Sequence, residues 1–198
     1  MQKELTYMTK EIDFYFDFIS PYSYLAHHKI KTIKNVNFNY KPVLVGGLHN
    51  LQGITAPAFI KAKLNHMISD CDLIAKKDKT NFIWNSKFPI NSLNIMRGYL
   101  FIDNEVKDLY LNQMFDANWK DNLDTSNEET IRIILEKCKI NSIDFFDGIK
   151  NIKIKNELKT ITQEAHDKGI FGAPTFVVNN KIFWGQDRLE FALDEYNK

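Results

Sequence analysis

The chain has 198 residues, of which 44% are hydrophobic and 26% are charged, so it is long enough for one globular domain or one domain with a large insertion. Its 26 basic and 25 acidic residues nearly cancel, which gives no electrostatic attraction to nucleic acid or to an anionic membrane. No stretch approaches the ~20 apolar residues of a membrane span, and Met1 to Lys10 contains no apolar run of signal-peptide length. We therefore expect a cytoplasmic protein that binds neither nucleic acid nor membrane.

The N-terminal part predicts a strand, a helix and a second strand. Glu11 to Ile19 alternates between apolar and other residues, which is typical of a strand. The residues that share one face are Ile12, Phe14, Phe16 and Phe18. Ser20-Pro21 ends this strand, and Ser23 to Ile33 is predicted to be a helix with Pro21 in its first turn. A strand from Asn37 to Val45 follows, so the three elements have the size of a βαβ unit.

The middle of the chain, from Gly46 to about Thr160, is predicted to be mostly helical. Helical spacing of apolar residues covers Ala56 to Ala75, Leu93 to Ile102 and Val106 to Trp119. Residues 124–127 offer N-caps for a helix from Glu128 to Lys139, with Ser126 and Glu129 spaced as a capping box. Ile152 to Lys168 is predicted to be a further helix that ends at Gly169.

Strand character returns near the C-terminus. Thr175 to Val178 and Lys181 to Trp184 are separated by the tight-turn pair Asn179-Asn180, and Leu189 to Tyr196 forms a short helix. Elements from the two chain ends can build one α/β sheet only if the helical block is an insertion that returns the chain to that sheet. On this topology we expect Ser20 and Ala173-Pro174 to meet in space.

Ser20 stands at the predicted start of a helix, where unpaired N–H groups and the helix dipole stabilise an anion such as a thiolate. A serine is itself a poor anion, so Ser20 either caps the helix or donates its O–H to a thiolate that belongs to a ligand. The two cysteines, Cys71 and Cys138, lie among apolar neighbours and form no C-x-x-C motif. The chain therefore offers neither a redox dithiol nor a zinc knuckle.

Two further places near the C-terminus are candidates for ligand binding. Pro174 forms either a rigid turn or, if the Ala173–Pro174 bond is cis, a strand end that presents the Ala173 backbone to a ligand. Gln186 and Asp187 follow Gly185 at the start of the last helix, which suits a ligand with an amine and a carboxylate and equally an ordinary capping Asp. The five histidines are scattered without metal-ligand spacing, so no metal site is predicted.

Taken together, these motifs resemble those of 2-hydroxychromene-2-carboxylate isomerases and the related kappa-class glutathione transferases. The N-terminal match is F-D-F-I-S-P-Y-S-Y-L-A, from Phe16 to Ala26. The C-terminal matches are G-I-F-G-A-P-T-F-V-V from Gly169 and F-W-G-Q-D-R-L from Phe183. Between them, P-V-L-V-G-G from Pro42 and F-P-I-N-S-L from Phe88 also match in order and spacing. The resemblance covers nearly the whole chain from Glu11 onward.

The resemblance implies an α/β, DsbA-like architecture, in which a thioredoxin-like fold carries a large inserted all-helical domain. Residues 11–45 and 169–198 would form the thioredoxin-like domain, and residues 46–168 the insertion. It also implies glutathione as the cofactor, with Ser20 bonded to the sulfur and a cis Pro174 that lets the Ala173 backbone pair with the cysteinyl unit. The remaining implied contacts are Gln186 and Asp187 with the γ-glutamyl end, Lys63 with the glycyl carboxylate, and Tyr22, Pro89 and Asn91 with the substrate. Tyr22 could equally pack on the insertion.

The activity implied is a glutathione-dependent cis–trans isomerisation of a conjugated aromatic keto acid. Relatives are often dimeric, so a homodimer is left open. One departure concerns the family pattern G-N-x-P-P, where this chain has Gly53-Ile54-Thr55-Ala56-Pro57. Ile54 replaces an asparagine that contacts glutathione or substrate in the family. Because an apolar side chain cannot make that contact, the identity of the aromatic substrate is left undetermined.

Three alternatives to the isomerase follow from the same motifs. A kappa-like glutathione transferase or peroxidase would use the same thiolate. A non-catalytic module would capture an extended peptide at the Pro174 edge. A dithiol oxidoreductase is excluded, because Ser20 and Ser23 occupy the positions of its two cysteines.

Overall fold

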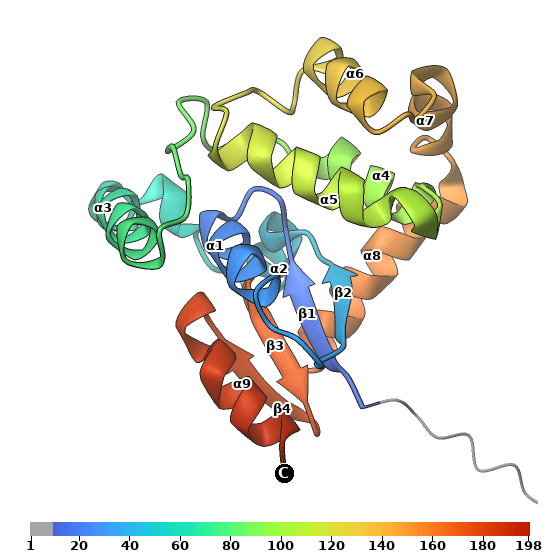
Figure 1. The fold of residues 1–198 in the computed structure, drawn as a ribbon. Helices are drawn as coiled ribbons and strands as arrows, with labels where there is room; N and C mark the ends of the chain where they lie inside the picture. Colours follow the sequence, from blue (N-terminus) through green and yellow to red (C-terminus); the bar gives the residue numbers. More distant parts are fainter. Residues whose placement is uncertain (1–9) are drawn as a thin grey trace, which may run out of the picture.

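The computed structural model describes residues 10–198 and has a four-stranded sheet at its centre, in the order β2-β1-β3-β4 (Figure 1). The strands are β1 (Ile12–Phe16), β2 (Phe38–Pro42), β3 (Thr175–Val178) and β4 (Lys181–Trp184). β1 pairs in parallel with β2 and antiparallel with β3, and β3 pairs antiparallel with β4. Strands from the two ends of the chain thus share one sheet, as predicted. The N-terminal segment on which the signal-peptide expectation rests lies, apart from Lys10, outside the described residues.

Helices make up most of the chain between β2 and β3, one further helix lies between β1 and β2, and another follows β4. They are α1 (Pro21–Ile30), α2 (Val45–Gln52), α3 (Lys61–Asp78), α4 (Leu93–Phe101), α5 (Asn104–Trp119), α6 (Glu128–Lys137), α7 (Ser142–Gly148), α8 (Ile152–Asp167) and α9 (Leu189–Tyr196), with short 3-10 turns η1 (Pro57–Phe59) and η2 (Gln186–Arg188). α2 and α7 were not predicted as separate helices. Between residues 10 and 198, no helix combines the length and the apolar character needed to cross a membrane.

Both faces of the sheet are covered. Ile12, Phe14 and Phe16 are fully buried in the larger core, which also contains residues of α1, α4, α5 and α9. Tyr15 points to the other face and packs with residues of α2 and α8 and their flanking segments, which are Val43, Leu48, Ala165 and Ile170. The division of the chain into residues 11–45 plus 169–198 and an insertion of residues 46–168 stays a prediction. In the structure, the second half of α8 lies against the sheet although it precedes residue 169.

Local signals explain most of the element ends. The hairpin between β3 and β4 turns at Asn179 and Asn180, with φ values of 50° and 60°, as a type I′ turn requires. Gly169 follows α8 with a φ of 86°, which glycine adopts without a steric penalty. The predicted capping box of α6 is wrong: Asn127 is the N-cap and accepts the amides of Glu129 and Thr130. Ser126 instead donates its hydroxyl to Asp124.

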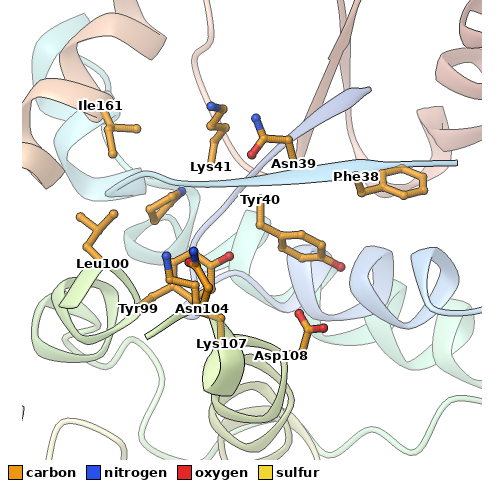
Figure 2. Close-up of a pocket in the computed structure, with 11 residues that line it drawn as sticks. Phe38, Asn39, Tyr40, Lys41, Tyr99, Leu100, Asn104, Lys107, Asp108 and Ile161 are labelled. Atoms are coloured by element: carbon orange, nitrogen blue, oxygen red, sulfur yellow. The ribbon is translucent and has the colours of Figure 1, made fainter. Parts of the chain in front are cut away.

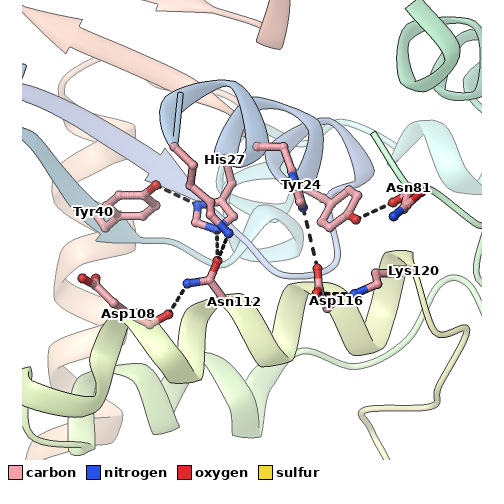
Figure 3. A network of polar contacts seen from close by, with 10 residues as sticks. Tyr24, His27, Tyr40, Asn81, Asp108, Asn112, Asp116 and Lys120 are labelled. Carbon is pink, nitrogen blue, oxygen red and sulfur yellow. Dashed lines mark hydrogen bonds and ion pairs between the residues drawn. The ribbon is translucent and has the colours of Figure 1, made fainter. Parts of the chain in front are cut away.

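A buried polar network fixes the position of α1 between β2 and α5 (Figure 3). His27 is only 3% exposed, and its Nδ1 and Nε2 lie 2.8 Å from the Tyr40 hydroxyl and 3.1 Å from Asn112 Oδ1. Burial lowers the pKa of His27 to about 4, so the imidazole is neutral at physiological pH. Because Asn112 Oδ1 can only accept, Nε2 carries the proton and Nδ1 accepts from Tyr40. His27 therefore has a packing role.

Candidate functional site

A cavity of about 1020 Å³ opens beside the start of α1. Its walls come from the residues before and at the start of α1, from α2, from η1 and the first turns of α3, from the loop before α4, and from residues 171–173 with Trp184. The volume lies at the upper end of the range for small-molecule sites. The basic side chains in its wall are His49, Lys63 and His66, and no Asp or Glu lines it within residues 10–198. The cavity therefore favours a ligand that carries negative charge or oxygen acceptors.

Ser20 and Ala173 meet in this cavity, as the topology predicted. The Ser20 hydroxyl donates to the Ala173 carbonyl oxygen at 2.9 Å, although 153 residues separate the two. Ser20 is also the N-cap of α1, because its Oγ accepts the Ser23 amide at 3.1 Å. The bond before Pro174 is cis, as the resemblance implied. The capping role of Ser20 is thus confirmed, and its hydroxyl proton already has an acceptor.

The N-terminus of α1 still offers a backbone donor next to Ser20. Pro21 has no N–H, and the Tyr22 amide hydrogen-bonds to none of the described residues. A helix N-terminus with a free amide is a favourable place for an anion. Ser23 lies on the inner side of α1, where it is fully buried and its Oγ has no partner in the part of the chain that the structure describes.

Neither of the chain's two cysteine thiols lines the cavity. Cys71 and Cys138 are both buried and free. Burial raises the pKa of the Cys71 thiol to about 12 and that of the Cys138 thiol to about 11. Neither cysteine can supply a thiolate to a ligand at the start of α1.

The cavity brings together most, but not all, of the predicted site residues. Its lining contains Ser20, Tyr22, Lys63, Pro89, Asn91 and Ala173. Pro174 is buried behind the wall, and Gln186 and Asp187 lie in η2, outside the lining. η2 is nevertheless close to Pro174, because the Gly185 amide donates to the Pro174 carbonyl at 3.0 Å.

Gln186 and Asp187 each have a charged neighbour. Gln186 is 8% exposed, and its Oε1 accepts from Lys29 Nζ at 2.6 Å, which leaves the amide NH2 as its donor group. Lys29 is also paired with Asp78 at 3.1 Å, so α1, the end of α3 and η2 are tied together. Asp187 is exposed and lies 3.2 Å from Arg188.

Tyr22 lies in the cavity wall and also packs on the helical block, while its contact with a substrate stays a prediction. It lines the cavity, and its hydroxyl donates to Asp70 of α3 at 2.8 Å. Burial first and the Asp70 hydrogen bond second raise the pKa of Tyr22, so the phenol stays protonated. Asn91 accepts the Leu93 amide at 3.0 Å, and the bond between Phe88 and Pro89 is cis.

Asp17 was not predicted as part of the site, yet it joins three of its walls. It is 1% exposed, and its carboxylate accepts the Ile19 amide at 3.2 Å and the Val45 amide at 2.9 Å. Burial raises the pKa of Asp17, while hydrogen bonds from Ser92, Val45 and Ile19 oppose that shift. Val45 is the first residue of α2, and Ser92 is the N-cap of α4. Asp17 therefore couples the start of α1 to the starts of α2 and α4.

Apolar and aromatic side chains form the outer wall, and sequence reasoning located only some of them. Phe171 and Trp184 pack with their ring centroids 4.7 Å apart and are 40% and 53% exposed. Phe59 is 73% exposed and lines the same cavity. Ile54, which replaces the family asparagine, is 46% exposed and also lies in the wall. The sequence signal for this rim was only the run of apolar residues around Pro57 and Gly172.

A second, smaller cavity of about 390 Å³ lies at the edge strand β2, against α4, α5 and α8 (Figure 2). Asn39 and Lys41 leave one side of β2 and Tyr40 leaves the other, next to Asp108 and Lys107. None of the predicted site residues lines it.

Known proteins match this chain along nearly all of its described residues. The model of the DSBA-like thioredoxin domain matches residues 11–197. The 2-hydroxychromene-2-carboxylate isomerase of Sphingobium xenophagum is 27% identical over 194 residues, covering 96% of this chain and 98% of the relative. Glutathione S-transferase kappa 1 of Homo sapiens is 23% identical over 201 residues, covering 92% and 89%.

Solved structures show the same fold. A selenomethionine 2-hydroxychromene-2-carboxylate isomerase superposes with a TM-score of 0.85 at 23% identity, over 92% of each chain. A probable DsbA oxidoreductase from Streptomyces coelicolor superposes with a TM-score of 0.72 at 11% identity, over 95% of this chain and 88% of the other. The resemblance seen in the motifs is therefore confirmed, and the chain belongs to the family of DSBA-like thioredoxin domains.

Proposed function

We propose that this protein is a glutathione-dependent isomerase of the 2-hydroxychromene-2-carboxylate type. One observation carries the proposal: Ser20 lies at the N-terminus of α1 against the Ala173 carbonyl, in a large cavity that no cysteine of the chain reaches. The relatives named above as isomerases and kappa-class transferases support the same reading. A site with this geometry but without its own thiol suits a thiol brought by a ligand.

The residues around Ser20 fit a thiolate. The Ser20 hydroxyl can turn from Ala173 toward a sulfur, and the free Tyr22 amide adds a second donor at the positive end of α1. A model thiol near pH 8.5 is only a few per cent ionised at neutral pH. A decrease of two pKa units corresponds to about 2.7 kcal/mol, which one charge-assisted hydrogen bond and the helix dipole together supply.

The chemistry that bound glutathione supplies is a thiolate nucleophile, which adds reversibly to the double bond of a conjugated carbonyl compound. The chain's own part is to bind and orient. Lys63 faces the cavity as a partner for a carboxylate, and when Ser20 turns away, the Ala173 carbonyl becomes free for an extended peptide backbone. Gln186 and Asp187 extend the contacts toward η2, beyond the cavity wall.

The test compares Ser20→Ala with Ser23→Ala by measuring glutathione affinity calorimetrically and the pKa of the bound thiol by its ultraviolet absorbance. Ser23 provides a matched control, because its hydroxyl has no partner among the described residues and does not line the cavity. We expect Ser20→Ala to raise the thiol pKa by about one to two units and to lower the isomerase rate about 10- to 100-fold. An unchanged thiol pKa would remove Ser20 from this role.

A glutathione transferase or peroxidase of the kappa type is the second candidate. The kappa-class relatives support it. Ile54, which replaces the family asparagine in the cavity wall, leaves the aromatic substrate of the isomerase undetermined. Product analysis separates the two, because an isomerase consumes no glutathione whereas a transferase or peroxidase releases an adduct or a disulfide. Absence of glutathione binding at millimolar concentration would leave the non-catalytic peptide-binding module as the better account.

A further inference from the structure

His49 is the one polar side chain that α2 contributes to the wall of the large cavity. Val45, Gly46 and His49 lie on the same face of this short helix and line the cavity together. The His49 carbonyl accepts the Ile54 amide at 3.0 Å, so the backbone that carries the ring is held at the end of α2. No functional role for His49 followed from the sequence, because α2 itself was not predicted.

The two ring nitrogens of His49 differ in their surroundings. Nδ1 is buried and has no hydrogen-bond partner within residues 10–198. Nε2 also makes no hydrogen bond to the described residues, but it is not among the buried atoms. Burial of the side chain lowers the pKa of His49, so the ring is neutral at physiological pH and carries one proton.

The position of that proton follows from a comparison of the two neutral tautomers. A buried N–H and a buried bare nitrogen both lose hydration, but the Nε2–H form is the intrinsically preferred neutral tautomer and places the N–H on the nitrogen that a ligand can reach. The proton therefore lies on Nε2, and the ring presents a donor on its accessible side. Lone-pair oxygens are the natural partners of such a donor.

The surroundings of His49 make this donor selective. The lining of this cavity is largely apolar and includes Ile54, Phe88 and Ile90. Hydrogen bonds in such a cavity are stronger than in water, and a ligand that covers the His49 donor without offering it an acceptor is disfavoured. His66 also lines the cavity, but it lies on the exposed surface of α3.

We propose that His49 determines specificity for the substrate by donating a hydrogen bond from Nε2 to the carbonyl oxygen of a conjugated ketone. The inference rests on the proposed function, since it assigns the substrate side of the same cavity. If a bound thiolate added to the conjugated double bond, negative charge would develop on that oxygen, and His49 would stabilise this charge without giving up its proton.

The first experiment uses the wild-type protein and two probes, trans-4-phenylbut-3-en-2-one and the hydrocarbon in which a methylene group replaces its carbonyl oxygen. Long-range proton–nitrogen NMR spectra report the tautomer of each histidine. We expect His49 to be protonated on Nε2, and its Nε2 resonance to shift with the ketone but not with the hydrocarbon. A proton on Nδ1, or equal shifts with both probes, would overturn the proposal.

The second experiment measures the affinity of both probes for His49→Phe, His49→Gln and the control His166→Phe, since His166 lies on α8 outside the cavity lining. We expect His49→Phe to bind the ketone about tenfold more weakly, with the hydrocarbon unchanged, and His49→Gln to restore part of the difference because its amide can donate. His166→Phe should bind the ketone like the wild type. Unchanged ketone affinity in His49→Phe would contradict the role of His49.

Glutathione binding is measured in the same variants to keep the two proposals apart. We expect His49→Phe to bind glutathione as the wild type does, because His49 acts on the other substrate. If the wild type binds the ketone through His49 but does not bind glutathione, the proposed function fails and the His49 site stands. If glutathione binds and the ketone preference is absent, only the His49 proposal fails.

Discussion

Replacing Asp17 by asparagine removes a buried charge and one acceptor from the place where three walls of the cavity join. In the wild type, one carboxylate oxygen accepts the Ile19 amide and the other accepts the Val45 amide. Leu44, the N-cap residue of α2, has no side-chain capping bond, so Asp17 supplies the cap from elsewhere in the sequence. Asparagine keeps one oxygen, but its NH2 group faces the other amide, which is then left unpaired.

The difference in the free energy of unfolding between the wild type and Asp17→Asn depends on pH in a defined direction. A buried unpaired amide costs about 1–3 kcal/mol, and we expect this loss when both Asp17 and its replacement are neutral. Because burial raises the pKa of Asp17, the neutral carboxyl stabilises the fold fully below the ordinary value of 3.8, and that stabilisation is lost as pH rises through the folded-state pKa. Asparagine does not titrate. The stability gap should therefore narrow between pH 4 and pH 7, by about 1.4 kcal/mol for each unit of the shift.

Urea unfolding followed by circular dichroism at pH 4, 5, 6 and 7 measures how much less stable Asp17→Asn is than the wild type. Asp103→Asn is the control, because Asp103 is exposed and its side chain makes no capping hydrogen bond. A gap that stays constant or widens with rising pH would refute the argument that Asp17 is destabilised by burial in its charged form.

Two further substitutions test the packing and the electrostatics of the fold. Lys198, Lys181 and Asn179 lower the pKa of Glu195 to about 2, so its stabilising contribution is complete above 4.5 and is lost as pH falls toward 2. Glu195→Gln should therefore flatten the decline of the melting temperature between these pH values, and an unaltered decline would contradict the assignment. Gly98→Ala would place a Cβ in steric conflict with the Phe145 ring and the Tyr110 hydroxyl, and should lower the free energy of unfolding by about 1–3 kcal/mol in chemical denaturation. Gly46→Ala meets no atom within 4 Å and should leave stability unchanged or slightly higher; equal losses in both variants would rule out the steric explanation.

The fold was predictable where the signals are local. Alternating apolar residues predicted β1, and the Asn179-Asn180 pair predicted the hairpin, because side-chain period and turn chemistry act within a few residues. The alternation nevertheless predicted burial on only one face of β1. The other face is covered as well, because Tyr15 on that face is only 2% exposed. α2 escaped prediction because its cap is Asp17, 28 residues earlier in the chain.

The site was predictable only in part for the same reason. Topology placed Ser20 against Ala173, since strands from both chain ends had to share a sheet. The resemblance supplied Lys63, Pro89 and Asn91, which all line the cavity. His49 and Asp17 depend on tertiary contacts that no local pattern reports: one needs the orientation of α2, and the other needs the meeting of three helix starts.

The Phe171–Trp184 rim gives the unlabelled protein a built-in optical reporter. Trp184 is 53% exposed at the cavity wall, whereas Trp119 is fully buried and its indole N–H donates to the Phe18 carbonyl at 2.8 Å. Indole emission moves to shorter wavelength when water leaves the ring. A molecule that covers Trp184 therefore shifts one component of the fluorescence, while the buried Trp119 and the half-buried Trp84 supply the background, so the filling of the cavity can be followed in real time.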